Sequence, residues 1–94
     1  QEVLRRGAAL DPLRTDLLNL MGVCHFKRGE YAQAVAAFQR VLELDPASAI
    51  DHANLGVNYE ALGDSDQAAA CYRTALSLDP GIDFARRNLA ALSG

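Results

Sequence analysis

The sequence predicts an all-α fold, an α-solenoid of antiparallel helix pairs with about six helices when partial units at its ends are counted. Two observations predict this class. The tripeptide Leu-Asp-Pro occurs three times, and its prolines, Pro12, Pro46 and Pro80, lie 34 residues apart. Between the prolines, apolar residues recur at the three- and four-residue spacing of amphipathic helices. A supersecondary unit of this length cannot bury its apolar face alone, so consecutive units are expected to stack.

The prolines divide the chain into four parts. Residues 1–14 are expected to form a partial unit with a second helix only, and residues 15–48 and 49–82 to form two complete units. Residues 83–94 are expected to form a capping helix that ends a longer array, because Arg86 and Ser93 give it the polar outer face on which stacking stops.

In the first complete unit, the first helix is expected to end before Gly29, because two cations precede this glycine, as helix C-termini prefer. The second helix is expected to end before Pro46, since proline disfavours helical geometry at the preceding residue. The apolar positions that recur at helical spacing are Leu17, Leu20, Met21 and Cys24 in the first helix and Ala34, Val35, Phe38, Val41 and Leu42 in the second.

The second complete unit repeats this scheme, with helices near residues 48–61 and 65–78. Gly22 and Gly56 hold the same mid-helix place in the two units, although glycine there costs about 1 kcal/mol relative to alanine. We therefore expect close packing at both glycines, with the large Phe38 and Tyr72 filling the space between neighbouring helices.

These residues resemble the tetratricopeptide repeat family, whose unit of 34 residues has a Leu-Gly pair, a later Ala, an aromatic residue and a closing Pro at fixed offsets. The pattern is matched by Leu18, Met21-Gly22, His25, Ala34, Phe38, Val41 and Pro46, and by His52, Leu55-Gly56, Tyr59, Ala68, Tyr72, Ala75 and Pro80. The resemblance covers essentially the whole chain. It implies a right-handed superhelix that binds a protein or peptide in a concave groove.

Composition narrows the function. A net charge of −3 argues against non-specific nucleic-acid binding, which needs a basic surface. No apolar run approaches the roughly 20 residues that cross a bilayer. Cys24 and Cys71 lack metal-ligand spacing and are expected to be small, buried core residues, which favours a reducing, cytoplasmic compartment.

The resemblance further implies that the first helix of each unit lines the groove. At the family's usual contact positions, the expected peptide-binding residues are Asn19, Val23, Phe26, Asn54, Val57, Phe84, Arg87 and Asn88. Asn54 and Asn88 hold equivalent positions, similar to the asparagine ladder by which some family members hold a peptide backbone, and an amide offers both a donor and an acceptor. The alternative is that these amides are solvated or bond to local backbone.

Chaperone-binding members of this family hold a C-terminal carboxylate with lysine, arginine and asparagine side chains. At the corresponding positions this chain has Asn19, Val23, Asn54, Phe84 and Asn88. Only Asn54 fits, so we expect no carboxylate clamp. Arg87 is the remaining groove cation, expected either to be solvated or to pair with an acidic ligand side chain.

No group of residues predicts catalysis, a metal site or a cofactor. His25 and His52 hold packing positions in different units, and Cys24 points about 100° away from its neighbour His25 on a helix. The sequence contains no phosphate-binding glycine-rich loop. The aspartates of the Leu-Asp-Pro tripeptides are expected to bond to local backbone in turns, and these residues are Asp11, Asp45 and Asp79.

The leading hypothesis is therefore a non-enzymatic scaffold that binds a peptide segment or partner protein in its concave groove. The alternative is a structural or oligomerisation segment of a larger multidomain protein. The alternative is supported by residues 1–10, whose partly uncovered apolar face favours self-association.

Overall fold

Five helices follow one another, with no strand between them, over residues 12–93, the part of the chain that the computed structural model describes. They are α2 (Pro12–Lys27), α3 (Tyr31–Leu44), α4 (Ala49–Ala61), α5 (Ser65–Leu78) and α6 (Asp83–Ser93). The all-α prediction is confirmed. The helix expected in residues 1–10 lies outside the described residues.

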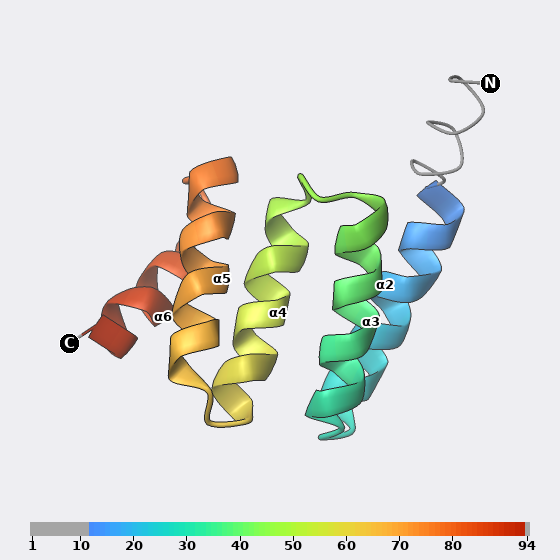
Figure 1. Ribbon diagram of the computed structural model, residues 1–94, viewed down its shortest axis with the longest axis horizontal. Helices are drawn as coiled ribbons and strands as arrows, with labels where there is room; N and C mark the ends of the chain where they lie inside the picture. Colours follow the sequence, from blue (N-terminus) through green and yellow to red (C-terminus); the bar gives the residue numbers. More distant parts are fainter. Residues whose placement is uncertain (1–11, 94) are drawn as a thin grey trace.

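Successive helices run in alternating directions (Figure 1). Each packs on the next along the chain, α2 on α3, α3 on α4, α4 on α5 and α5 on α6. The turns within the two helix pairs, α2–α3 and α4–α5, lie at one end of the molecule, and the α3–α4 and α5–α6 connections lie at the other end (Figure 1). The chain therefore stacks antiparallel helix pairs, as the repeat predicts.

Glycine ends the first helix of each pair. Gly29 has φ +78° and Gly63 has φ +84°, in the left-handed region that glycine enters without steric cost. After the second turn, the Asp64 carboxylate accepts a hydrogen bond of 3.2 Å from the backbone N–H of Gln67 and caps α5. Pro12 differs from the other two prolines because it begins α2, a first-turn position where its missing N–H has no helical partner to lose.

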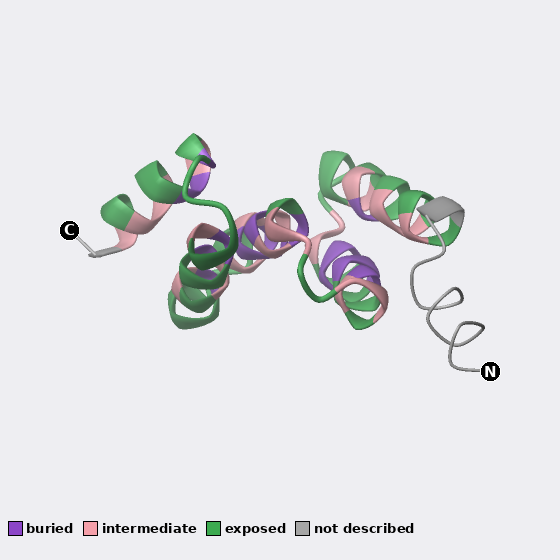
Figure 2. Cartoon of the chain, turned by 90° about the horizontal axis from the view of Figure 1, so that it is seen from above, coloured by how far each residue is buried: buried purple, intermediate pink, exposed green. Residues whose placement is uncertain are grey.

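Two buried clusters form the core, each centred on an aromatic ring. The first contains Phe38 with Leu55 of α4, and the second contains Tyr72 with Ala53 of α4. Because α4 contributes to both clusters, it joins the two halves. Seen from above, the buried residues lie where the helices meet and the outer faces are exposed (Figure 2).

The close approach expected at the repeated glycines is confirmed. A Cβ atom on Gly22 would lie 2.8 Å from the Phe38 ring, and one on Gly56 would lie 2.8 Å from the Tyr72 ring. Contacts this short do not occur between real side chains, so only glycine allows these rings to lie against the preceding helix.

One apolar stripe of α2 is exposed, which corrects a prediction. Leu17, Leu20 and Met21 are 54, 57 and 51% exposed, and Cys24 is exposed beside them. The prediction that Cys24 is buried is therefore wrong, while Cys71 is half-buried. The physical reason is that α2 packs on α3 with its other side, and burial at a repeat position depends on a neighbouring unit.

No helix in the described part of the chain is both long and apolar enough to span a membrane.

Candidate functional site

A shallow cavity lies between α2 and α4, above the ring of Phe38. Its volume is about 230 Å³, including the space open to solvent. The lining residues are Val23 and Phe26 of α2, Phe38 of α3, and Asn54, Val57 and Asn58 of α4. Four of the eight residues expected to bind a peptide are thus brought together: Val23, Phe26, Asn54 and Val57.

Phe26 is held in place by an aromatic contact. Its ring centroid lies 5.8 Å from that of Tyr31, at an interplanar angle of 58°, a tilted geometry that aromatic pairs favour. The Phe26 side chain nevertheless stays 38% exposed. An apolar ring fixed at the surface beside a cavity can contact a ligand without first being ordered.

The apolar surface continues from α4 towards α6. Val57 and Phe84 both pack, partly buried, against the cluster around Tyr72. Val57 also lines the cavity, so it connects the α2–α4 cavity with the α6 residues. On α6, Arg87 is exposed and Asn88 is partly buried.

The hydroxyl group of Tyr72 ties α4, α5 and α6 together. It donates a hydrogen bond of 2.7 Å to Glu60 Oε1 and accepts one of 3.1 Å from Asn88 Nδ2. Burial, and then the hydrogen bond to Glu60, raise the pKa of Tyr72. Asn88 therefore has an internal partner, and its amide is not wholly available to a ligand.

Asn19 lies apart from this cavity. Its side-chain amide donates a hydrogen bond to Asp51, a buried carboxylate that also accepts one of 2.5 Å from the Ser48 hydroxyl. Asn19 and Asp51 line a separate hollow between α2 and α4. The partner of Asn19 is 32 residues away in the sequence, in the next unit, so local sequence patterns do not reveal it.

Sequence analysis missed Asn58, which lines the cavity and is only 1% exposed. Its Nδ2 donates 2.8 Å to the backbone oxygen of Asn54, and its Oδ1 is buried without a hydrogen-bond partner among the described residues. One signal could have found it. The equivalent residues of the neighbouring units are Cys24 and Leu92, so Asn58 is a polar residue at a position otherwise held by less polar ones.

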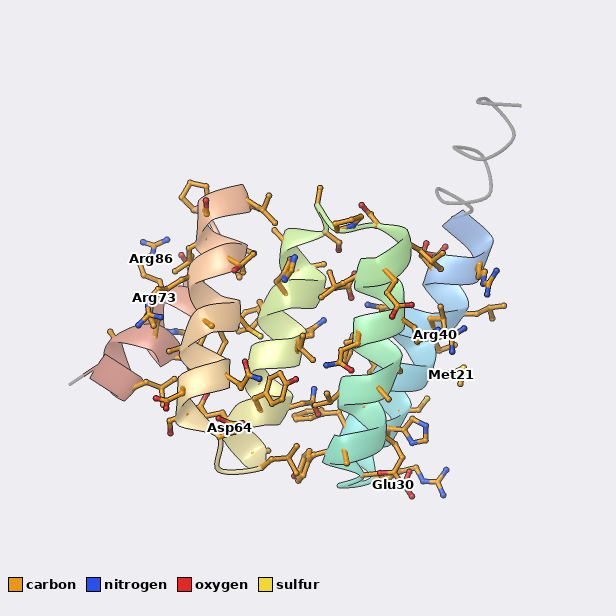
Figure 3. The ribbon with its side chains drawn as sticks, viewed as in Figure 1. Met21, Glu30, Arg40, Asp64, Arg73 and Arg86 are labelled. Atoms are coloured by element: carbon orange, nitrogen blue, oxygen red, sulfur yellow. The ribbon has the colours of Figure 1, made fainter. Side chains whose placement is uncertain are left out.

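The histidines bond to nearby groups in turns. His25 Nδ1 donates 2.7 Å to Glu30 Oε1, and His52 Nε2 lies 2.9 Å from the Pro46 carbonyl oxygen. The bond from His25 lowers the pKa of Glu30 from its ordinary 4.5, with the Arg28 charge in support and partial burial in opposition. Figure 3 shows Glu30 and Asp64 at the two turns within the helix pairs, at the same end of the molecule.

Neither nucleophilic nor metal chemistry is favoured by this geometry. Burial raises the pKa of the Cys71 thiol to about 11, so the group is protonated at neutral pH. Within residues 12–93, no three histidine, cysteine, aspartate or glutamate side chains converge on a point where a metal ion could bind.

The fold and these repeat contacts define a helical-repeat protein, and comparison with known proteins identifies the family. The family profile described as Tetratricopeptide repeat matches residues 13–80, which is more than half of the chain. The chain belongs to the tetratricopeptide repeat family. No curated protein sequence matches it.

Two solved structures have similar folds. The first TPR of Spaghetti (RPAP3), bound to the HSP90 peptide SRMEEVD, has a TM-score of 0.80 and 22% identity over 83% of this chain and 62% of that chain. The Sgt2 TPR domain from Aspergillus fumigatus has a TM-score of 0.80 and 28% identity over 84% of this chain and 52% of that chain. The chain therefore spans about three fifths and about half of the lengths of these two structures.

Proposed function

We propose that the chain is a protein-interaction scaffold that binds an extended peptide segment of a partner along the face formed by α2, α4 and α6. The observation that carries this proposal is the cavity where Val23, Phe26, Asn54 and Val57 meet. Apolar walls with a few convergent polar groups are typical of binding sites. Because packed helices already hold these side chains in place, little ordering entropy opposes capture of a ligand.

The charge of the site limits the ligand. The HSP90 peptide bound by the structurally similar Spaghetti domain carries three acidic residues. No residue that lines the α2–α4 cavity is charged, and the family's clamp positions lack a cation in this chain. We therefore expect a segment that is neutral where it crosses this cavity, with an acidic residue favoured only near Arg87.

The test is affinity selection of displayed random heptapeptides on the 94-residue chain, followed by calorimetry with selected synthetic peptides. Asn54→Ala should weaken binding roughly 2- to 10-fold, the loss of one hydrogen bond of about 0.5–1.5 kcal/mol. Val57→Ser should weaken it further. Leu62→Ser is the matched control, because Leu62 is an exposed apolar residue directly after α4 that does not line the cavity.

Circular dichroism of each variant checks that the helices are retained. Unchanged affinity in both Asn54→Ala and Val57→Ser, with affinity lost in Leu62→Ser, would place binding outside the proposed face and contradict the proposal.

A second candidate function is a structural segment of a larger assembly. It is favoured by the exposed stripe of Leu17, Leu20 and Met21, which is apolar enough to pack on another unit or subunit. Under this reading, sedimentation velocity should show concentration-dependent association that Leu20→Lys abolishes. A chain that stays monomeric at all concentrations and binds selected peptides would count against this candidate.

A further inference from the structure

The two interfaces between consecutive first helices differ by one hydroxyl group. Between α4 and α6, the Tyr72 hydroxyl lies between two partners, the carboxylate of Glu60 and the amide of Asn88. Between α2 and α4, the residue 34 positions earlier than Tyr72 is Phe38, which has no hydroxyl group.

The groups around the missing hydroxyl are present without it. Asn54 is the counterpart of Asn88, and its side-chain amide makes no hydrogen bond among the described residues. The counterpart of Glu60 is Phe26, which offers no acceptor. An acceptor comes from Asn58 instead, whose Oδ1 is buried and unpartnered. Phe38, Asn54 and Asn58 all line the α2–α4 cavity.

The orientation of the Asn58 amide follows from its bond to the backbone oxygen of Asn54. Exchanging its oxygen and nitrogen would bring two acceptors together, so Oδ1 must be the free atom. A buried acceptor without a partner is destabilising, and native proteins seldom keep one without a function.

We propose that the α2–α4 cavity binds the side chain of a serine or threonine from the peptide segment, with its hydroxyl group in the place that the Tyr72 hydroxyl fills at the next interface. The ligand hydroxyl would donate to Asn58 Oδ1 and accept from Asn54 Nδ2. This inference rests on the proposed function and names the residue type that the same site selects.

The cavity restricts the ligand to a short, neutral side chain. The Phe38 ring already fills the space that corresponds to the Tyr72 ring, so room remains only for the hydroxyl end of a side chain. The whole volume of about 230 Å³ is below the roughly 300–1,000 Å³ of small-molecule sites. A backbone N–H cannot leave the main chain to enter a cavity, and a charged group would find no counter-charge in the lining. The methyl group of threonine suits the walls formed by Val23 and Val57.

The experiment compares peptides selected from a displayed random heptapeptide library on three chains: the wild type, Asn58→Leu and Phe38→Tyr. Asn58→Leu keeps the branched shape and removes the acceptor. Phe38→Tyr supplies the hydroxyl group from within the protein. On the wild type, one peptide position should be enriched in serine and threonine. Replacing that threonine by the isosteric valine should weaken binding by at least about 5-fold, a loss at the lower end of those measured when a buried polar group is left unpaired.

On Asn58→Leu the threonine and valine peptides should bind equally, because the acceptor is gone. Both Asn58→Leu and Phe38→Tyr should unfold at a higher temperature than the wild type, since each removes or satisfies the buried unpaired oxygen.

Two results would overturn the inference in distinguishable ways. Peptides that depend on Val57 but show no preference for a hydroxyl residue would overturn this inference and leave the proposed function standing. A library that gives no peptide sensitive to Val57→Ser would overturn both. A threonine preference that persists unchanged in Asn58→Leu would also overturn the inference, because it would assign the hydroxyl to a different site.

Discussion

Replacing Gly56 with alanine places one methyl group where the Tyr72 ring touches α4. The new Cβ atom would lie 2.8, 3.0 and 3.1 Å from three ring carbons. The ring has no room to retreat, because Tyr72 is fully buried and its hydroxyl is bonded to Glu60 and Asn88. The methyl group must therefore displace α4 from α5 or break those bonds.

The magnitude follows from two opposing effects. Alanine is favoured over glycine in a helix interior by about 1 kcal/mol. Overpacking of a core typically costs about 1–3 kcal/mol, and a ring held at both its face and its hydroxyl is at the upper end. We expect Gly56→Ala to lower the free energy of unfolding by about 2 kcal/mol, a large share of the roughly 5–14 kcal/mol expected for 94 residues.

Gly22→Ala is the informative comparison. Its Cβ atom would also lie 2.8 Å from a ring, that of Phe38. The Phe38 ring has no hydroxyl group to hold it and lines the α2–α4 cavity, so it can shift. We expect this variant to lose about 1 kcal/mol or less, since the helix propensity of alanine offsets most of the smaller packing cost.

Urea denaturation followed by circular dichroism measures both variants. Ala36→Gly, at an exposed position of α3, is a control that measures the propensity difference alone in this fold. If Gly56→Ala is as stable as the wild type or more stable, the ring contact does not constrain the packing and the reasoning is refuted.

Three further changes have defined outcomes. Tyr72→Phe should lower the free energy of unfolding by about 1 kcal/mol, the usual net value of a lost hydrogen bond, and equal stability in urea denaturation would argue against a structural role for its hydroxyl. Glu30→Gln removes a carboxylate whose pKa is lowered in the folded state chiefly by His25, so its stabilising effect is complete above its ordinary pKa of 4.5 and is lost as the pH falls below it. The difference in melting temperature between wild type and variant should therefore narrow on acidification; a constant difference would contradict this. Exposed Cys24 should react with a disulfide reagent at pH 8 at least 10-fold faster than half-buried Cys71, whose thiol has a pKa of about 11; equal rates would refute this.

The repeat determined most of the fold because its signals are local. Gly29, Gly63 and Pro46 mark chain reversals through backbone geometry alone, so they predicted where helices end. The repeated Gly22 and Gly56 predicted close approaches, because their cost in a helix requires a compensating contact.

The site was predictable only in part, because its polar contacts join different units. The family positions predicted Val23, Asn54 and Val57, and the structure places them in one cavity. The same reasoning did not predict that Asn19 bonds to Asp51 or that Asn58 Oδ1 is unpartnered. These features depend on which side chain of a neighbouring unit is near, and a 34-residue pattern records only residue types.

Burial on α2 failed for the same reason. Helical spacing identifies an apolar stripe, but it does not tell which side of a helix another unit covers. Cys24 lies on a stripe that no described helix packs against extensively, so it is exposed although its sequence context is apolar.

The most direct test of the proposed function is nuclear magnetic resonance mapping of a selected peptide on the isotope-labelled chain. The methyl signals of Val23 and Val57 and the side-chain amide signal of Asn54 should shift together as the peptide saturates. Shifts confined to the exposed stripe of Leu17, Leu20 and Met21, with these groups unaffected, would contradict binding along the α2, α4 and α6 face.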